Sequence, residues 1–373
     1  MSKKGENIYK RKDGRWEARY IKGRCVDGKP KYGYCYAQSY REVRKKVSVL
    51  KADLLLAKPA VSAGGREKFS CYCDEWLKLS RFRVKESSYV KYYSIINKHV
   101  KPGLGDLQVA AITSITIEEF CRMLLFDKKL SSKTVKDILV LVKSILKYTR
   151  KSYPGIMADV EIIYPKAEKK ETRVLTREEQ KRLTDYLLCD MDNIKFGVLL
   201  TLMTGLRIGE ICALRWCDVS LKERVIRVGA TMQRIKITDE GGNSKTRIIV
   251  STPKTDSSAR LIPLTDLAVE LCTVFNNQNP AAFVLSGSAE HFIEPRVLQN
   301  RLEHFTKDCG LEGVHYHTLR HSFATRCVEV GFEIKSLSEI LGHSSPTITL
   351  ERYIHSSMDL KRSNMDKLSL IGY

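Results

Sequence analysis

The sequence predicts a multidomain fold: a small α+β module with a three-stranded sheet plus helix, an all-α block, and a mixed, mainly-α α+β region. With 373 residues, the chain exceeds the usual size of one domain. Its hydrophobic pattern changes along the chain from strand-like to helical and then to mixed. Two stretches with linker composition, residues 61–67 and 166–172, separate the parts. The expected domains are therefore residues 1–60, 68–165 and 173–373.

The distribution of charge separates the first two parts from the third. The net charge of +21 attracts polyanions, of which nucleic acid is the most common. A solvated surface or a ribosome-associated protein would give the same total. Residues 1–60 hold 17 Lys and Arg against 6 Asp and Glu, residues 68–165 hold 17 against 10, and residues 166–373 hold 29 against 26. We therefore expect the first two parts to contact DNA and the third to be a more balanced catalytic body.

Several protein classes are disfavoured by the sequence. The basic N-terminus has no apolar segment after it, so no secretory signal is expected, and no stretch approaches the roughly 20 apolar residues that span a bilayer. Among eleven cysteines, Cys71 and Cys73 form one CxC, without a second pair at zinc-ribbon spacing. An odd number of scattered cysteines fits reduced thiols. We expect a cytoplasmic protein with no metal.

The first part is predicted to contain short strands within residues 8–36. Residues 14–20 alternate after a Lys-Asp-Gly turn, and residues 31–36 alternate again, with three tyrosines on one face. Ser39 is expected to cap a basic helix over residues 40–56. Of the aromatic residues Trp16, Tyr20, Tyr32 and Tyr34, we expect most to belong to the core of this module.

The second part is predicted to be a helical bundle with basic outer faces. Apolar residues recur at helical spacing in four segments between Phe69 and Tyr164. The second helix is expected to end at Pro102-Gly103, and Ser131-Ser132 to cap the fourth.

The third part mixes helices and strands. Thr176 begins a capping box, and a very apolar helix ends at Gly205. Strands are expected at 225–228, 246–251 and 260–263, with helices from about residue 296. Residues 229–246 lengthen the hairpin that precedes the third strand. This extension is expected to be either a solvated loop or an extra contact with DNA or a partner.

Four short motifs follow one another in this third part. They are G-L-R-I-G-E at 205–210, P-K-T-D-S-S-A-R-L-I-P-L at 253–264, H-T-L-R-H at 317–321, and L-G-H at 341–343, followed by Tyr353. Each motif alone is weak: an arginine or a turn lysine is usually an exposed side chain, a histidine after a helix end is often a dipole partner, and a tyrosine most often serves packing. Their conjunction, in this order, rarely arises by accident.

The pair His317 and His321 has a second interpretation. Their i, i+4 spacing is one that binds zinc, yet Thr318 stands where a zinc protease carries glutamate. We therefore expect no metal here, and we expect His321 to be structural.

The four motifs resemble the tyrosine recombinase (phage integrase) family over roughly residues 170–360, and the three-part layout resembles integrases of conjugative transposons and temperate phages. The resemblance implies a site-specific DNA recombinase that cleaves and religates DNA through a 3′-phosphotyrosine intermediate, integrating and excising a mobile element without a cofactor. The catalytic residues it implies are Arg207, Lys254, His317, Arg320, His343 and Tyr353.

The resemblance also implies a role for each cationic residue. Arg207 and Arg320 would bind the scissile phosphate, since a planar guanidinium matches two phosphate oxygens. Glu210 would orient the site. Lys254 would act as the general acid that protonates the departing 5′ oxygen, which is a poor leaving group without a proton.

The remaining roles concern the nucleophile and its neighbours. Tyr353 would displace the 5′-hydroxyl, and because a phenol has a pKa of about 10, its attack needs deprotonation or strong electrostatic help. His317 would donate a hydrogen bond or transfer a proton, and His343 would support the phosphate site.

The other two parts would bind DNA separately. The resemblance implies an arm-type DNA-binding domain at residues 1–60 and a core-binding domain at 68–165, which together bridge core and arm att-type sites. It further implies a homotetramer on DNA, excisionase or DNA-bending accessory proteins, and a C-terminal tail docked in cis or in trans. The expected DNA-reading residues, on a sheet placed in the major groove, are Arg15, Arg19, Lys22 and Arg24.

Three alternatives are weighed against this interpretation. A type IB topoisomerase uses similar chemistry, but the arm-like N-terminal module argues against it. A DNA-binding regulator derived from a recombinase would not need all six catalytic residues. A generic basic RNA-binding protein is disfavoured because no RNP-like aromatic motif is present.

Overall fold

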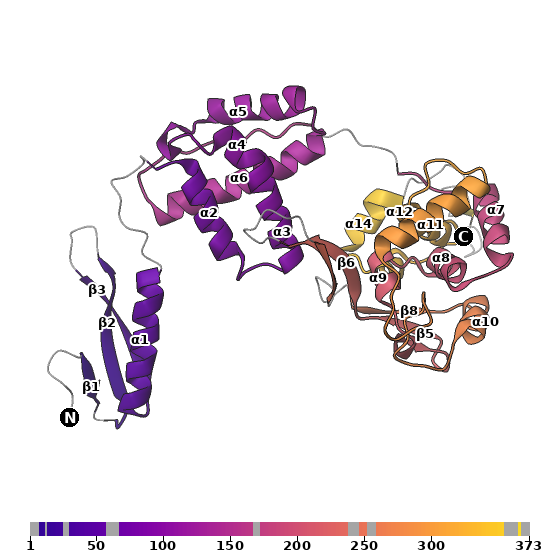
Figure 1. The fold of residues 1–373 in the computed structure, drawn as a ribbon, viewed down its shortest axis with the longest axis horizontal. Helices are drawn as coiled ribbons and strands as arrows, with labels where there is room; N and C mark the ends of the chain where they lie inside the picture. The colour runs from indigo at the N-terminus through magenta and orange to yellow at the C-terminus, as the bar shows by residue number, and fades with distance from the viewer. Residues whose placement is uncertain are drawn as a thin grey trace. The chain divides into compact units, whose positions relative to one another are not determined.

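The computed structural model describes residues 7–11, 13–24, 30–56, 67–166, 172–237, 246–251, 259–353 and 365–366. The chain divides into two compact units, residues 1–83 with 94–166, and residues 84–93 with 167–373. Figure 1 shows the helices and strands of each unit. Within the described ranges, no helix combines the length and the apolar character that a membrane crossing requires.

The N-terminal module is a three-stranded antiparallel sheet with one helix along a face (Figure 1). Its elements are β1 (Ile8–Lys10), β2 (Trp16–Arg24), β3 (Pro30–Ala37) and α1 (Tyr40–Leu56). The Ser39 hydroxyl accepts a hydrogen bond from the Glu42 amide at 3.3 Å, which confirms the predicted cap. Between sheet and helix lies a small core of Ile8, Ala18, Ala37, Val43 and Val47.

The aromatic residues of this module divide between two faces of the sheet. Trp16 and Tyr20 pack against the core, as expected. Tyr32 and Tyr34 are 37% and 50% exposed, so two of these four aromatic residues, and not most of them, belong to the core. The register explains this, because Arg19 pairs with Tyr34 and successive side chains on a strand point to opposite faces. When Ala18 faces α1, Arg19 and its cross-strand tyrosine must face away from it.

The helical block contains α2 (Phe69–Ser80), α3 (Glu86–Ile95), α4 (Lys101–Leu104), α5 (Ser114–Arg122) and α6 (Ser132–Ser152). Two π-helical turns, η1 (Ile96–Val100) and η3 (Met123–Asp127), and one 3-10 turn, η2 (Val109–Ala111), link them. The Ser131 side chain caps α6 by accepting from the Thr134 amide.

One predicted boundary in this block was wrong. The second helix does not end at Pro102-Gly103, because η1 leads directly into α4, which contains both residues. Pro102 lies near the start of α4, directly after the π-helical turn η1. The Gly105 amide then donates to the Lys101 carbonyl at 2.9 Å.

The third part is mainly helical, with two small antiparallel sheets of strand order β4-β5-β8 and β6-β7. Its helices are α7 (Arg177–Leu188), α8 (Asn193–Thr204), α9 (Ile208–Ala213), α10 (Asp266–Phe275), α11 (Pro295–Asp308), α12 (Tyr316–Glu329), α13 (Ile334–Leu341) and α14 (Pro346–Tyr353), with a 3-10 turn η4 (Trp216–Asp218). Its strands are β4 (Val219–Ser220), β5 (Val225–Val228), β6 (Thr231–Lys236), β7 (Thr246–Ser251) and β8 (Arg260–Pro263).

The three strands predicted in this part are confirmed as β5, β7 and β8. Strand β6 was not predicted, although the turn-forming residues Asp239, Gly241, Gly242 and Asn243 follow it in the sequence, and it forms a full ladder with β7. Residues 238–245 of the hairpin lie outside the described residues. The predicted capping box is also present, with the Glu179 amide donating to Thr176 Oγ1 at 3.1 Å and the Thr176 amide donating to Glu179 Oε2 at 2.8 Å.

Helix α8 forms the centre of this part and positions the segment that follows it. Phe196 stacks on Phe275 at 4.6 Å between ring centroids, and Thr201 shares a buried 2.6 Å hydrogen bond with the Tyr316 hydroxyl at the start of α12. The helix ends at Gly205, whose φ of +66° is in the left-handed region that glycine adopts without strain. The chain therefore turns sharply and places Arg207 two residues later.

Candidate active site

The carboxyl end of α13 receives hydrogen bonds from three arginines that belong to three other segments of the chain. The last carbonyls of a helix have no partner within it and carry a partial negative charge, so guanidinium groups bind them well. The three bonds run from Arg260 Nε to the Ile340 carbonyl at 2.5 Å, from Arg320 Nη2 to the Leu341 carbonyl at 2.5 Å, and from Arg207 Nη2 to the Gly342 carbonyl at 2.9 Å.

Glu210 supplies the carboxylate of this group and is 5% exposed. It accepts hydrogen bonds from the Arg207 backbone amide at 2.9 Å and from Arg207 Nη1 at 2.8 Å. Arg260 donates to both carboxylate oxygens, with Nη1 at 3.0 Å and Nη2 at 2.8 Å. Burial raises the pKa of the Glu210 carboxyl, but Arg260 and Arg207 outweigh it and hold that pKa below its usual range. Glu210 is therefore an anion that fixes two arginines.

Among the residues that the structure describes, Arg320 is the largest fully buried side chain, with 1% exposure. Besides its bond to α13, it donates to the Gly205 carbonyl at 2.7 Å. Burial, followed by the charge of Arg207, lowers the pKa of Arg320 to about 9. Together with Glu210, the residues Arg207, Arg260 and Arg320 are called the arginine cluster below. Three guanidinium groups face one carboxylate in this cluster, so an entering anion would be stabilised there.

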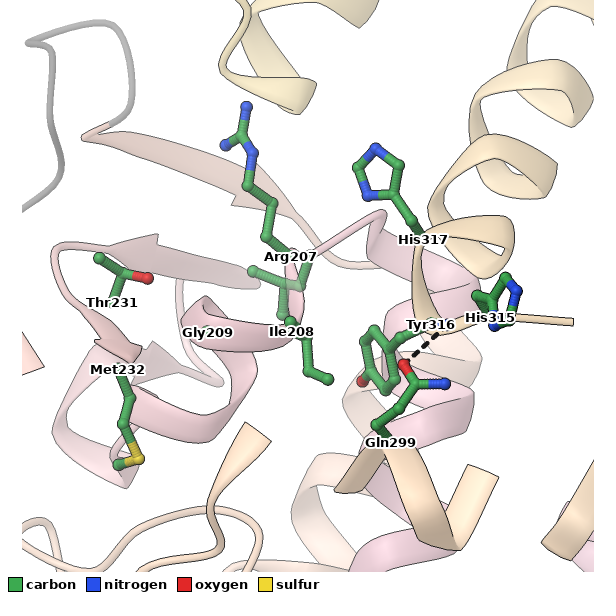
Figure 2. Close-up of a pocket in the computed structure, with 10 residues that line it drawn as sticks. Arg207, Ile208, Gly209, Thr231, Met232, Gln299, His315, Tyr316 and His317 are labelled. Carbon is green, nitrogen blue, oxygen red and sulfur yellow. Dashed lines mark hydrogen bonds between the residues drawn. The ribbon is translucent and has the colours of Figure 1, made fainter. Parts of the chain in front are cut away.

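Arg207 and His317 line a pocket of about 450 Å³. Figure 2 shows both side chains projecting to one side, away from Gln299 and Tyr316, which are joined by a hydrogen bond from the Tyr316 amide to Gln299 Oε1 at 3.2 Å. The Arg207 side chain is one-third exposed and His317 is exposed. These two side chains are therefore accessible to a ligand.

Tyr353 ends α14 with its phenol turned inward. It is 7% exposed and packs with Ala324 and Cys327 of α12 and with Leu337 and Leu341 of α13. The phenol hydroxyl lies within electrostatic range of Arg320.

Two histidines lie beside the phenol. His321 Nδ1 is 2.8 Å from the Tyr353 oxygen. The His343 ring is parallel to the phenol, with centroids 6.3 Å apart, and its Nδ1 shares a 2.8 Å hydrogen bond with Thr349 Oγ1. His343 follows Gly342, which ends α13 with φ of +63°. This turn carries the chain from the arginine cluster to the helix that bears Tyr353.

The structure thus brings five of the six predicted catalytic residues into one region around α12, α13 and α14. The sixth, Lys254, lies outside the described residues, although Ser251 and Ala259 on either side of its segment are described. No group of three or more His, Cys, Asp or Glu side chains in the described ranges is arranged to hold a metal ion.

Two residues of this region were given no catalytic role by sequence reasoning, and His321 was expected to be structural. Arg260 shares a strand face with buried Ile262, because i and i+2 point the same way, and a buried arginine needs a partner such as Glu210. His321 shares a helical face with His317, and their rings meet edge to face at 4.5 Å. Both spacings were visible in the sequence.

The predicted DNA-reading residues lie on or beside the N-terminal sheet. Arg19 stands over the Tyr32 ring at 3.9 Å, and Arg15 lies 5.9 Å from the Tyr36 ring centroid. Lys22 and Arg24 belong to β2, and their side chains lie outside the described residues.

Comparison with known proteins agrees with this arrangement. Residues 173–359 match the model of the phage integrase family, and residues 68–125 match that of a phage integrase N-terminal SAM-like domain. A tyrosine recombinase XerC-like protein of Caldanaerobacter subterraneus is 28% identical over 320 residues, which is 79% of this chain and 81% of that protein. The ICEBs1 integrase of Bacillus subtilis is 25% identical, covering 76% of this chain and 78% of the integrase.

Solved structures show the same fold. The Tn1549 transposon integrase in complex with a circular intermediate DNA aligns with a TM-score of 0.67 at 19% identity, covering 81% of this chain and 99% of that one. A lambda integrase dimer bound to a core site aligns with a TM-score of 0.57 at 16% identity, covering 95% and 96%. The family match extends over half of the chain and contains the arginine cluster and Tyr353. The protein therefore belongs to the phage integrase family and is a site-specific tyrosine recombinase of the kind that serves mobile elements.

Proposed function

We propose that this recombinase cleaves double-stranded DNA by attack of the Tyr353 phenol on a backbone phosphate, which forms a 3′-phosphotyrosine and frees a 5′-hydroxyl. One observation carries the proposal: the carboxyl end of α13 binds three guanidinium groups, and the helix that follows returns Tyr353 to within electrostatic range of Arg320. A phosphate needs cations and a nucleophile at the same place, and α12, α13 and α14 provide both.

The roles of the two phosphate-binding arginines differ with their exposure. Arg207 is accessible from the pocket, so it would donate directly to phosphate oxygens, while Glu210 keeps its guanidinium in place. Arg320 is buried and donates to two backbone carbonyls. Its charge would therefore stabilise the phosphate from the protein interior, and the side chain would not have to move during the reaction. Preorganised cations of this kind stabilise charge that develops on phosphorus oxygens in the transition state.

The leaving group requires a proton, and Lys254 is proposed to give it. Arg260 begins β8 six residues after Lys254 and is bound to Glu210 and α13. This anchor holds the first residue of β8 at the arginine cluster. His317, on the accessible side of the pocket, would donate a hydrogen bond to the phosphate, and His343 would support the turn between cluster and nucleophile.

Rejoining is the reverse reaction. The 5′-hydroxyl of the new partner strand attacks the phosphotyrosine, and Tyr353 leaves. The bond energy remains in the protein–DNA link, so neither ATP nor a cofactor is needed.

The remaining parts would select the DNA. We assign residues 1–60 to arm-type sites through Arg15, Arg19, Lys22 and Arg24, residues 68–165 to core sites, and residues 173–373 to catalysis, with linkers at 61–67 and 166–172. Related integrases have been solved on a core site and, as a tetramer, on a Holliday junction. A homotetramer on DNA, aided by an excisionase or a DNA-bending protein, in the cytoplasm at the nucleoid, is the corresponding proposal here.

A suicide substrate with a nick next to the cleavage site tests the nucleophile, since the short 5′ fragment diffuses away and traps the covalent adduct. Wild type is expected to accumulate the adduct and Tyr353→Phe to form none. Tyr186→Phe is the matched control, because it removes a hydroxyl bound to Asp308 on the surface of the same unit and is expected to behave as wild type.

An adduct with Tyr353→Phe would overturn the assignment. Relaxation of supercoiled DNA by a monomer, without exchange of strands between two sites, would instead favour a topoisomerase.

A further inference from the structure

His321 occupies a place that the proposed mechanism does not yet use. It lies on α12 one turn after His317 and directly after Arg320, and it is 7% exposed. Its Nδ1 meets the Tyr353 oxygen at 2.8 Å, the length of a hydrogen bond. A buried imidazole at the reacting oxygen is in the position of a proton acceptor.

The neighbouring histidines are engaged differently. His317 is exposed and lines the pocket beside Arg207, so it faces the substrate side. His343 directs its Nδ1 to Thr349 and lies parallel to the phenol ring. His321 brings a ring nitrogen to the phenol oxygen itself.

The charges around His321 favour proton transfer from phenol to imidazole once a phosphate is bound. The titratable groups in contact with His321 are His317 from α12 and Tyr353 from α14, Arg320 of α12 acts on the phenol of Tyr353, and Cys327 lies further along α12. Burial raises the pKa of the Cys327 thiol to about 12, so it adds no charge. The positive charge of Arg320 lies within electrostatic range of the Tyr353 phenol and stabilises a phenolate there.

We propose that His321 is a further catalytic residue, the base that receives the Tyr353 proton. In cleavage, the O–H bond of the phenol breaks and its proton moves to Nδ1 of a neutral imidazole whose other nitrogen carries hydrogen. The phenolate oxygen forms a bond to phosphorus, the bond from phosphorus to the 5′ oxygen breaks, and that oxygen takes a proton from the general acid. In religation, the imidazolium returns the proton to the departing phenolate. This inference rests on the proposed function and deepens it.

A substrate with sulfur in place of the bridging 5′ oxygen isolates this step, because a thiolate leaves without a proton. Loss of the general acid is then rescued, whereas loss of the base is not. His321→Asn is the informative variant, since its amide oxygen takes the place of Nδ1 and accepts the hydrogen bond but cannot take the proton. His304→Asn, at an exposed position of α11, is the matched control.

His321→Asn is expected to bind DNA as wild type does and to cleave both substrates about 10²- to 10⁴-fold more slowly, the usual contribution of a general base. Its rate should rise about tenfold per pH unit toward the ordinary phenol pKa of about 10, while Lys254→Ala recovers on the sulfur substrate. The wild-type rate on that substrate should fall in acid, as a histidine protonates. His304→Asn should match wild type.

The outcomes separate the two proposals. If wild type forms no adduct, the proposed function itself fails. If wild type forms the adduct and His321→Asn forms it equally fast, or more slowly with an unchanged pH profile, then His321 is not the base. Should His321→Asn fail to bind DNA, the pH dependence of wild-type cleavage on the sulfur substrate decides. A rate that does not fall at low pH overturns the inference, and a rate that falls at low pH supports it.

Discussion

Arginines lie in opposite environments in the N-terminal sheet and in the arginine cluster. In the sheet, the Arg15 side chain is 59% exposed and Arg19 stands over the Tyr32 ring. In the cluster, Arg260 is 5% and Arg320 1% exposed, and both are bound to backbone carbonyls. Exposed arginines adapt to a partner and are screened by salt, whereas buried ones hold fixed directions at low dielectric. The first environment suits DNA recognition, and the second suits transition-state stabilisation.

The largest expected effect on stability comes from removing a buried partner. Arg260→Ala should lower the free energy of unfolding of the catalytic unit by about 3–5 kcal/mol, because Glu210 loses two of its charge-assisted hydrogen bonds inside the protein. The matched control is Arg234→Ala, whose pair with Glu294 is exposed and is worth about 0–1 kcal/mol. Urea unfolding measures the loss of unfolding free energy in both variants. Equal losses would show that the buried pair contributes no more to stability than the exposed pair.

The largest expected effect on catalysis comes from Arg207. Arg207→Ala should lower single-turnover cleavage by about 10²- to 10³-fold, the usual cost of losing one preorganised donor in a transition state. DNA binding should remain close to wild type, because most of the affinity comes from other phosphate contacts. Arg301→Ala, which removes an exposed pair with Asp192, is the control. If Arg207→Ala lost binding and cleavage in parallel, the residue would have a binding role alone.

Most of the fold followed from the sequence, while the contacts that assemble the site did not. Strands β5, β7 and β8 were predicted because alternation is a local signal, whereas β6 depends on a partner across an extension. Arg207 and Arg320 were recognisable from their motifs. Their attachment to successive carbonyls at the end of α13 arises between segments far apart in the chain. Sequence spacing alone could not reveal that geometry.

A pH dependence follows from Glu210. Its pKa is lowered in the folded protein, so it contributes stability that is present above the ordinary glutamate value of about 4.3 and is lost as pH falls through the lowered value. Glu210→Gln should therefore be less stable than wild type at pH 7, and the difference should shrink below about pH 4. Chemical unfolding across this range measures it. A difference that stayed constant with pH would mean that the carboxylate charge contributes nothing.

The smallest effect is expected in the sheet and concerns salt rather than stability. If Arg19 contacts one phosphate of arm-type DNA, Arg19→Ala should reduce the slope of log affinity against log salt by about 0.9 while leaving cleavage of a core site unchanged. Fluorescence anisotropy at several salt concentrations gives the slope, and the suicide substrate gives the cleavage rate. The nearby Tyr32→Leu keeps apolar bulk but removes the ring under the guanidinium, so it should weaken binding without changing the slope. A salt slope unaffected by Arg19→Ala would place DNA recognition elsewhere in the module, and the contrast between exposed and buried arginines would then concern catalysis alone.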